Sequence, residues 1–308
     1  MFDTVRFYVP VVPDNTAVQN IVNGLDWCKE GTGKTLLYGN CINMRVALFT
    51  DKSLFVTGSI SKFTLGSNIY TPTREQIMEG VESLSDRLSI DFNSAKVTRL
   101  DVSTVIETEH QPQLYYNSLG TKQYFERMTV TDNTLLYHTK GRQLMFYDKR
   151  KEIEDKGGTV PKDYEGSNLL RYEMRLLKSP YRQLRLKTVT GLDLYDKDFY
   201  NKAVQMWCSE FESITKLNKA TMKPAKETMT VTEVRNLFLA KTIQDCRKME
   251  DIEYFIQECK EQKMFPDPKY YTRLKASLYS YFNTPTNEGN GYAEELERKV
   301  REVASRAV

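Results

Sequence analysis

The sequence predicts an α+β protein, with a mostly antiparallel sheet carrying helices on one face and a helical C-terminal domain after it. Two observations predict this class. Up to about residue 190, short runs of strand-forming residues alternate with turn residues, and beyond it apolar residues recur at helical spacing. A chain of 308 residues with 40% hydrophobic and 28% charged content is long enough to bury such a core. We therefore expect two domains, over residues 1–190 and 191–308.

Eight segments of the first domain have the composition of strands, and one has that of a helix. The predicted strands are residues 4–12, 35–48, 53–59, 97–107, 122–130, 134–138, 142–148 and 168–177. In the predicted helix, residues 73–89, Thr73 and Gln76 form a capping box, and the apolar residues Ile77 and Val81 begin a stripe at helical spacing. These elements predict an antiparallel sheet with a helix on one face.

The second domain is predicted to be helical. Its first helix contains Phe199, Ala203 and Trp207 at helical spacing. Further helices are expected at residues 231–246, 249–261, 268–282 and 292–306, and the segments KATMKPAKE and NTPTNEGNG between them have the composition of linkers.

The tripeptide Gly33-Lys34-Thr35 is part of the phosphate-binding P-loop signature, but its context does not fit. The signature needs a glycine six residues before the lysine, where this chain has Cys28, and a helix after it, where strand formers follow. A turn explains Gly31 and Gly33 more simply. The sequence therefore argues against a P-loop ATPase.

The cysteines argue against a zinc-binding protein, and the hydropathy argues against a membrane or secreted protein. Five cysteines, widely spaced and without a CxxC pair, predict reduced thiols and no zinc site. No run of about 18 apolar residues is present, and the N-terminal residues lack the features of a signal peptide. We expect a cytoplasmic protein that does not contact a membrane.

Two predicted strands each place one carboxylate beside arginine on the face away from the core. In VTRLDVSTVIE this carboxylate is Asp101, and in NLLRYEMRLL it is Glu173, flanked by Arg171 and Arg175. If the two strands are neighbours, the pair could share one Mg²⁺ or Mn²⁺, since such cations bind one or two carboxylates and keep several waters. The alternative is that these are surface ion pairs on an exposed sheet face.

A basic segment lies between these two strands. It contains two tyrosines, Tyr137 and Tyr147, on adjacent predicted strands, beside the cationic residues Lys140, Arg142, Lys149, Arg150 and Lys151. Residues 140–187 hold 13 lysines and arginines against 7 acidic residues, which fits a polyanion-binding face or a solvated surface. A phenol close to a divalent cation and lysines can attack a phosphodiester, because the cations stabilise the developing negative charge.

Taken in order, TRLDVSTVIE, TLLYHTKGRQLMFYDKRKEIE and LLRYEMRL resemble the pattern of rolling-circle replication initiators of the filamentous-phage type, which are related to plasmid initiators. The resemblance covers roughly residues 40–180 and implies a replication-initiator nuclease-like fold. It implies that a tyrosine attacks one strand at an origin, keeps the 5′-phosphate and leaves a 3′-hydroxyl primer. It further implies that Lys149 assists catalysis and that Lys140, Arg142, Arg150, Lys151, Arg171 and Arg175 contact DNA.

The resemblance implies Asp101 and Glu173 as metal ligands and either Tyr137 or Tyr147 as the nucleophile. The nicking segment of the plasmid relatives favours Tyr137, whereas Tyr147 matches a tyrosine shared more broadly. The chain departs from the many initiators that bind metal through a His-hydrophobic-His pair, because it has only two histidines, 28 positions apart. His110, which follows the Asp101 strand, is a candidate additional ligand.

The leading hypothesis is thus a metal-dependent, origin-specific DNA-nicking enzyme in the cytoplasm of a bacterial host. Its implied partners are origin DNA, both double-stranded and locally single-stranded, and the host helicase and polymerase; self-association remains open. The alternatives are a non-catalytic DNA-binding replication regulator, which would bind DNA through sheet aromatics and lysines, and a mobilisation relaxase, which shares the chemistry. The C-terminal helices would serve origin recognition or oligomerisation.

Overall fold

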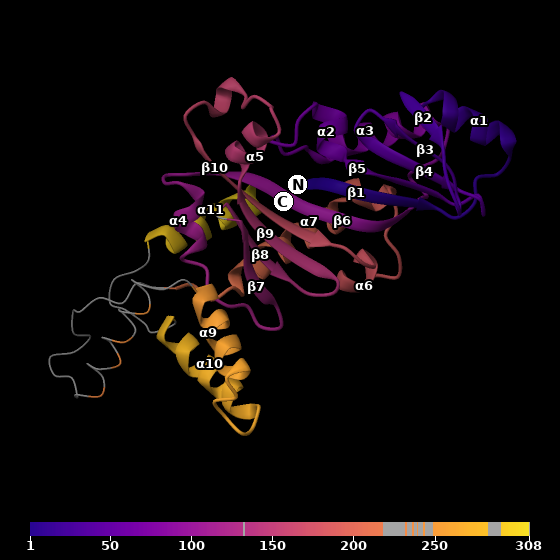
Figure 1. The fold of residues 1–308 in the computed structure, drawn as a ribbon. Coiled ribbons are helices and arrows are strands. Elements are labelled where there is room, and N and C mark those ends of the chain that lie inside the picture. Colours follow the sequence, from indigo (N-terminus) through magenta and orange to yellow (C-terminus); the bar gives the residue numbers. More distant parts are fainter. Residues whose placement is uncertain are drawn as a thin grey trace.

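The computed structural model contains one large antiparallel sheet with helices packed on one face (Figure 1), which confirms the predicted fold class. It describes residues 1–131, 133–217, 249–282 and 291–307, and the single positions 232, 236, 239 and 243. Within these residues, no helix is both long and apolar enough to span a bilayer.

Ten strands of the described chain form this sheet, in the order β2-β3-β4-β5-β1-β6-β10-β9-β8-β7. Their bounds are β1 Phe2–Val9, β2 Trp27–Glu30, β3 Thr35–Cys41, β4 Met44–Phe49, β5 Leu54–Ser59, β6 Lys96–Thr108, β7 Glu126–Thr131, β8 Thr134–His138, β9 Arg142–Asp148 and β10 Asn168–Leu176. The first strand therefore lies in the middle of the sheet, and β10 is inserted between β6 and β9.

The described helices range from single turns to helices of 13–17 residues. Their bounds are α1 Asn15–Asn23, α2 Ile60–Leu65, α3 Arg74–Leu88, α4 Pro112–Tyr116, α5 Lys149–Asp155, α6 Pro180–Gln183, α7 Lys197–Glu212, α9 Met249–Glu261, α10 Lys269–Phe282 and α11 Gly291–Ala307, with 3-10 turns at Lys162–Tyr164 and Leu192–Tyr195. The helix predicted at residues 73–89 is α3, and Thr73 and Gln76 form the expected capping box.

The largest difference from the sequence-based expectation lies near residue 42. The single strand expected over residues 35–48 is two strands, because Ile42 adopts a left-handed conformation with φ 55° and the chain reverses between Cys41 and Met44. The continuous run of strand-forming residues conceals this turn. The glycines before it lie in a hairpin between β2 and β3, with Gly33 at φ 64°, as the absence of a P-loop context predicted.

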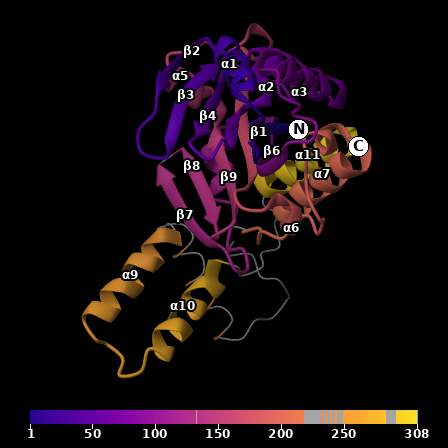
Figure 2. The same ribbon diagram turned by 90° about the vertical axis from the view of Figure 1, so that its right-hand side faces the viewer.

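The two faces of the sheet differ. Helices α3, α7 and α11 lie on one face (Figure 2), and on that face Tyr172 of β10 stacks on Phe146 of β9 and contacts Trp207 of α7. We call this the inner face and the opposite one the outer face. Among the described residues, α5 and the segment around Asn68 cover one end of the outer face: α5 contacts β10, and the carbonyl oxygen of Asn68 accepts a hydrogen bond from Arg171.

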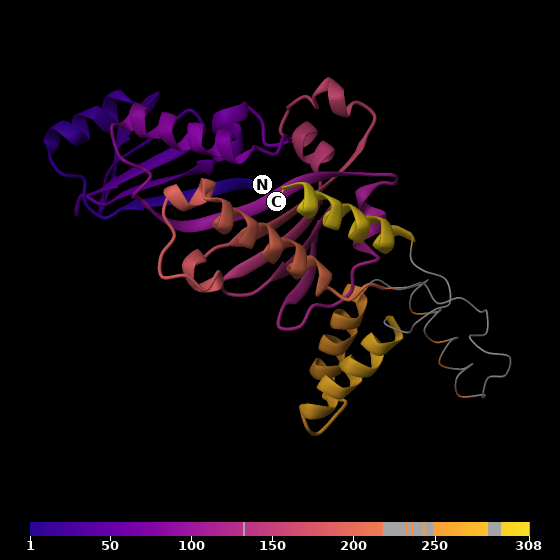
Figure 3. The same cartoon turned by 180° about the vertical axis from the view of Figure 1, so that it is seen from behind.

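The C-terminal helices divide between two hydrophobic clusters. Helices α7 and α11 pack against each other and against the sheet (Figure 3), so the main core extends past residue 190. Helices α9 and α10 form a smaller cluster of their own with Leu217. Three of the predicted helices thus correspond to α9, α10 and α11. The predicted helix 231–246 lies outside the described residues except for positions 232, 236, 239 and 243, and so do the linker KATMKPAKE and nearly all of the linker NTPTNEGNG.

Candidate active site

The carboxylates of Asp101 and Glu173 come together on the outer face of the sheet. Strands β6 and β10 are direct neighbours, and their register places Asp101 opposite Arg175 and Glu173 opposite Ser103. The Nε atom of Arg175 lies 2.8 Å from Glu173 Oε1 and 3.9 Å from Asp101 Oδ2. These two carboxylate oxygens are therefore at most about 7 Å apart. A cation with ligand bonds of about 2–2.6 Å bridges two oxygens that lie within about 5 Å of each other, so the pair would have to close to that spacing around the ion.

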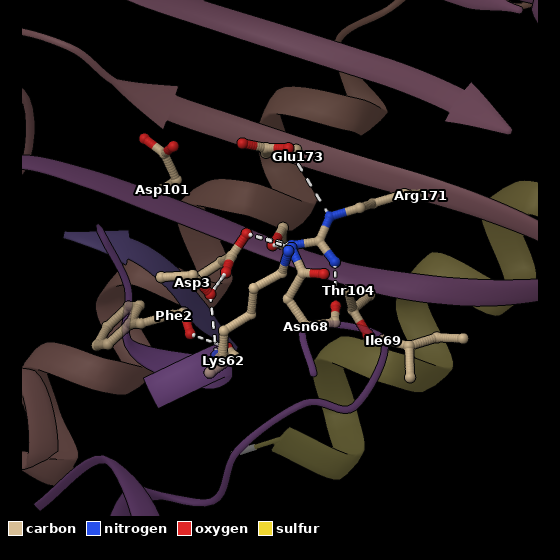
Figure 4. A network of polar contacts seen from close by, with 12 residues as sticks. Phe2, Asp3, Lys62, Asn68, Ile69, Asp101, Thr104, Arg171 and Glu173 are labelled. Carbon is tan, nitrogen blue, oxygen red and sulfur yellow. Dashed lines mark hydrogen bonds and ion pairs between the residues drawn. The ribbon is translucent and has the colours of Figure 1, made fainter. Parts of the chain in front are cut away.

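Arginines neutralise both carboxylates. Arg99 binds Asp101 with two hydrogen bonds, from Nε at 2.9 Å and from Nη2 at 2.5 Å. Arg171 lies between Glu173, 3.7 Å away, and Asp3 of β1, 2.5 Å away (Figure 4). Asp101, Glu173 and Arg171 are almost inaccessible to solvent. Buried charges of this kind are tolerated when they are paired and hydrogen-bonded. Each charge in this network has an oppositely charged partner, although the Nε atom of Arg171 is buried without a hydrogen bond.

The two carboxylates differ in their affinity for a proton. Burial raises the pKa of Asp101 to about 7, and the negative charge of Glu173 adds to the shift. Burial also acts to raise the pKa of Glu173, but Arg175 and Arg171 outweigh it and the pKa falls below its usual value. Near neutral pH, Glu173 is thus ionised while Asp101 exchanges a proton, a division of roles typical of paired catalytic carboxylates.

Tyr147 belongs to the same network. It lies opposite Arg171 in the β9–β10 pair, and its hydroxyl donates a hydrogen bond to Glu173 Oε2 at 3.3 Å. Burial, supported by the carboxylates around it, raises the pKa of Tyr147 well above its usual value. The phenol is therefore neutral at rest, and it needs an acceptor for its proton before it can act as a nucleophile. Glu173 already occupies that position.

Lys149 lies directly after β9, at the start of α5. Its side chain is buried, and Nζ donates to Asn68 Oδ1 at 2.9 Å and pairs with Glu152 at 2.7 Å. Burial and the nearby Arg171 lower the pKa of Lys149. The structure thus brings the predicted residues Asp101, Glu173, Tyr147 and Lys149 to one end of the outer face.

Tyr137 does not reach this group. It pairs with Leu144 in the β8–β9 hairpin and points to the inner face, where it is fully buried with its ring edge-on to Phe146. Its hydroxyl donates to the carbonyl oxygen of Gly120 at 2.6 Å. Because side chains alternate between faces along a strand, Tyr137 is separated from the two carboxylates by the sheet itself.

His110 is also remote from the carboxylates. It follows the end of β6, and Thr108 alone is seven residues from Asp101, or about 23 Å along a strand. Its imidazole packs edge-on against Tyr292 of α11 at 5.1 Å. His110 therefore lies too far from Asp101 and Glu173 to be the additional metal ligand that the sequence suggested.

The predicted DNA-binding cations fall into two groups. Arg171 and Arg175 lie within the carboxylate network, as described. Of the others, Arg142 binds Glu210 and Gln183, and Arg150 donates to the carbonyl oxygens of Tyr164 and Ser167. Lys140 and Lys151 are exposed, the former in the turn between β8 and β9 and the latter in α5.

Sequence reasoning missed Asp3 and Asn68. Asp3 is buried on β1, where it binds Arg171, accepts a hydrogen bond from Ser59 and contacts Asn68. Asn68 links Arg171 to Lys149 through its backbone carbonyl and its side chain. The available signal was an acidic residue within FDTVRFYV, a segment of mostly apolar residues, because a buried acid needs a partner.

Asp101 and Glu173 fit Mg²⁺ or Mn²⁺ by donor type, since both cations prefer carboxylate oxygens. No third histidine, cysteine or acidic residue joins them closely enough to form a larger ligand cluster within the described residues. Arg99 and Arg175 occupy the same oxygens. A cation would therefore have to displace arginine contacts and complete its shell with water or DNA oxygens.

Comparison with known families identifies the chain. The Phage_CRI family model, which describes the N-terminal part of a phage replication-associated protein, matches residues 14–194. This range includes every strand of the sheet except β1, and it includes Asp101, Glu173, Tyr147 and Lys149 but not Asp3. A comparison with curated proteins found no match. Because the family model covers more than half of the 308 residues, the chain belongs to the Phage_CRI family of replication-associated proteins, the filamentous-phage rolling-circle initiators.

Proposed function

We propose that this initiator nicks one DNA strand at its origin by attack of Tyr147 on a phosphodiester. The observation that carries the proposal is the hydrogen bond from the Tyr147 hydroxyl to the ionised Glu173, beside Asp101. A phenol, a proton acceptor and a second carboxylate of different pKa are the groups that such a transesterification needs.

Each residue has a definite role in this reaction. Glu173 orients the Tyr147 phenol and accepts its proton, and the phenolic oxygen attacks phosphorus. The bond from phosphorus to the 3′-oxygen breaks, which leaves a 5′-phosphotyrosyl link and a 3′-hydroxyl. Asp101, whose pKa is about 7, can hold the proton that the leaving 3′-oxygen takes up. Lys149 and Arg171 supply positive charge near the attacked phosphate.

A Mg²⁺ or Mn²⁺ ion held by Asp101 and Glu173 would supply further positive charge against the scissile phosphate. Arg175 and Arg99 are the residues that would have to release carboxylate oxygens for it. The 3′-hydroxyl would then prime the host polymerase behind a host helicase, with origin DNA as the substrate.

The test compares Tyr147→Phe and Tyr137→Phe with wild type on supercoiled DNA of the protein's own replicon in Mn²⁺ or Mg²⁺. Open circles and a covalent protein–DNA adduct are expected from wild type and Tyr137→Phe, and neither from Tyr147→Phe. Glu173→Gln should retain DNA binding and slow nicking by about 10²- to 10⁴-fold, the usual size of a lost acid–base group.

The pattern of failures is informative. Nicking that survives Tyr147→Phe and disappears with Tyr137→Phe would make the core tyrosine the nucleophile and refute the assignment. DNA binding by wild type without any nicking or adduct would instead identify a non-catalytic replication regulator.

A further inference from the structure

The outer face of β2, β3, β4, β5, β1 and β6 carries two continuous rows of cross-strand neighbours. Residues directly opposite each other in antiparallel strands share a face, so the register defines each row. The first row is Lys29, Tyr38, Ala47, Phe55, Tyr8 and Lys96. The second row is Trp27, Asn40, Arg45, Thr57, Arg6 and Arg99. We call these twelve residues the aromatic-basic rows.

The composition of these rows differs sharply from that of the whole chain. They contain five cations and four aromatic residues but no acidic residue, although acids and bases are nearly balanced over the full sequence. None of the twelve side chains is buried, whereas alternate residues of β1, β4 and β5, such as Phe7, Val46 and Val56, form the core. Within the described residues, neither Lys29 nor Arg45 forms an ion pair. This face therefore carries uncompensated positive charge.

The aromatic rings lie where they can stack on flat ligands. Trp27 is 45% and Tyr38 43% exposed, and their ring centroids are 6.1 Å apart. Further along, Tyr8 and Phe55 lie 4.9 Å apart. Exposed aromatic residues among cations are the features with which proteins bind single-stranded DNA without sequence preference, since every base offers a π-face and every phosphate a charge.

The rows lead directly into the candidate active site. The last residue of the second row is Arg99, which binds Asp101 with two hydrogen bonds. Six neighbouring strands at about 4.8 Å spacing give a track of about 24 Å between Trp27 and Arg99. A single DNA strand that follows the rows from Trp27 to Arg99 would therefore reach the Asp101 and Glu173 carboxylates.

We infer that the aromatic-basic rows form a docking track for single-stranded DNA, which holds the strand flanking the nick. The inference rests on the proposed function, because that proposal places the nick at the end of the rows where Arg99 contacts Asp101. The charge of the rows, their exposed aromatic rings and their continuity with Arg99 and Asp101 carry it. The DNA chemistry recognised is the phosphate backbone and the base faces, not a base sequence.

The protein contains its own probe for this inference. Its two tryptophans are Trp207, fully buried under the sheet, and Trp27, at the far end of the second row. Titration of the full chain with an oligothymidylate of about 16 nucleotides, a length within the usual range for one aromatic-lined face, should quench tryptophan fluorescence. The titration is done in EDTA so that no cleavage occurs. Trp27→Phe should still bind the oligonucleotide, and the quenching should be absent.

Two variants measure the contribution of the track, with binding followed by fluorescence anisotropy of a labelled oligothymidylate. Trp27→Leu, which keeps an apolar side chain but loses the stacking ring, should weaken binding by about 5- to 100-fold. Arg45→Gln should weaken binding and lower the slope of log affinity against log salt by about 0.7. The matched controls on α9 are Tyr254→Ala, 75% exposed in wild type, and Lys260→Gln; both should bind as wild type does.

Several outcomes would overturn the inference. Unchanged affinity in both Trp27→Leu and Arg45→Gln, with circular dichroism showing an intact fold, would exclude the track. A DNA-free dimer by light scattering that becomes a monomer in Trp27→Leu would show that the face joins two copies of the chain. Failure of the proposed function looks different: wild type would bind the oligonucleotide through Trp27 and yet nick no origin DNA.

Discussion

We expect Tyr137→Phe to lower the stability of the protein and Tyr147→Phe to abolish its nicking activity. In Tyr137→Phe, the buried carbonyl oxygen of Gly120 loses a hydrogen bond of 2.6 Å from a fully buried hydroxyl. Leaving such an acceptor unsatisfied costs about 1–3 kcal/mol of unfolding free energy. In Tyr147→Phe, the lost bond is 3.3 Å long and its acceptor, Glu173, keeps two arginine partners, so the loss should stay below about 1 kcal/mol.

The assay pairs two measurements on each variant. Urea denaturation followed by circular dichroism gives the unfolding free energy, and single-turnover nicking of origin DNA at a temperature where every variant is folded gives the rate. Tyr137→Phe should lose stability and keep its rate, whereas Tyr147→Phe should keep stability and lose its rate. Tyr137→Phe with wild-type stability and no nicking would refute the structural argument, because it would place the hydroxyl of a core residue in the chemistry.

Three further predictions concern the carboxylates and the core. Burial raises the pKa of Asp101 from 3.8 to about 7, so the folded protein loses stability as the pH rises between these two values. Asn does not ionise, so the unfolding free energy of Asp101→Asn in EDTA should rise relative to that of wild type over the same pH range, by at most about 1.4 kcal/mol per pH unit. A difference that does not vary with pH in urea denaturation would contradict this. Mn²⁺ at about 100 times its dissociation constant should stabilise wild type by about 2.7 kcal/mol in the same assay and leave Glu173→Gln unchanged. Trp207→Ala should lose about 3–5 kcal/mol, because Tyr172 and the sheet lose a fully buried partner; a change below about 1 kcal/mol would show that the core closes over the cavity.

The sequence predicted the face of each carboxylate but could not establish that they are neighbours. Strict alternation places Asp101 and Glu173 away from the core, and the structure agrees. Their adjacency depends on the insertion of β10 between β6 and β9, which is a long-range pairing that local patterns do not encode. The enclosure of Arg171 likewise depends on Asp3 and Asn68, which are 168 and 103 residues away along the chain.

The sequence could have predicted that the two tyrosines lie on opposite faces of the sheet. The segment TKGR predicts a tight turn, and Lys140 and Gly141 are its two central residues, with Thr139 bonded to Arg142. Pairing outward from that turn sets Tyr137 opposite Leu144 and Tyr147 opposite Thr134. The two tyrosines therefore face opposite sides of the sheet. The resemblance to the plasmid nicking segment favoured Tyr137, and the hairpin register favours Tyr147.

The central position of β1 and the late insertion of β10 have a consequence for how the chain folds during synthesis. Strands β2 to β5 form a local meander to which β1 can add only after β5 is made, and the free edge of β6 must wait for β10, the last of the described strands. Until residue 176 has left the ribosome, a strand of 13 residues therefore exposes unpaired backbone groups. Fragments that end before β10 should aggregate, and synthesis of this initiator should depend on chaperones that shield that edge.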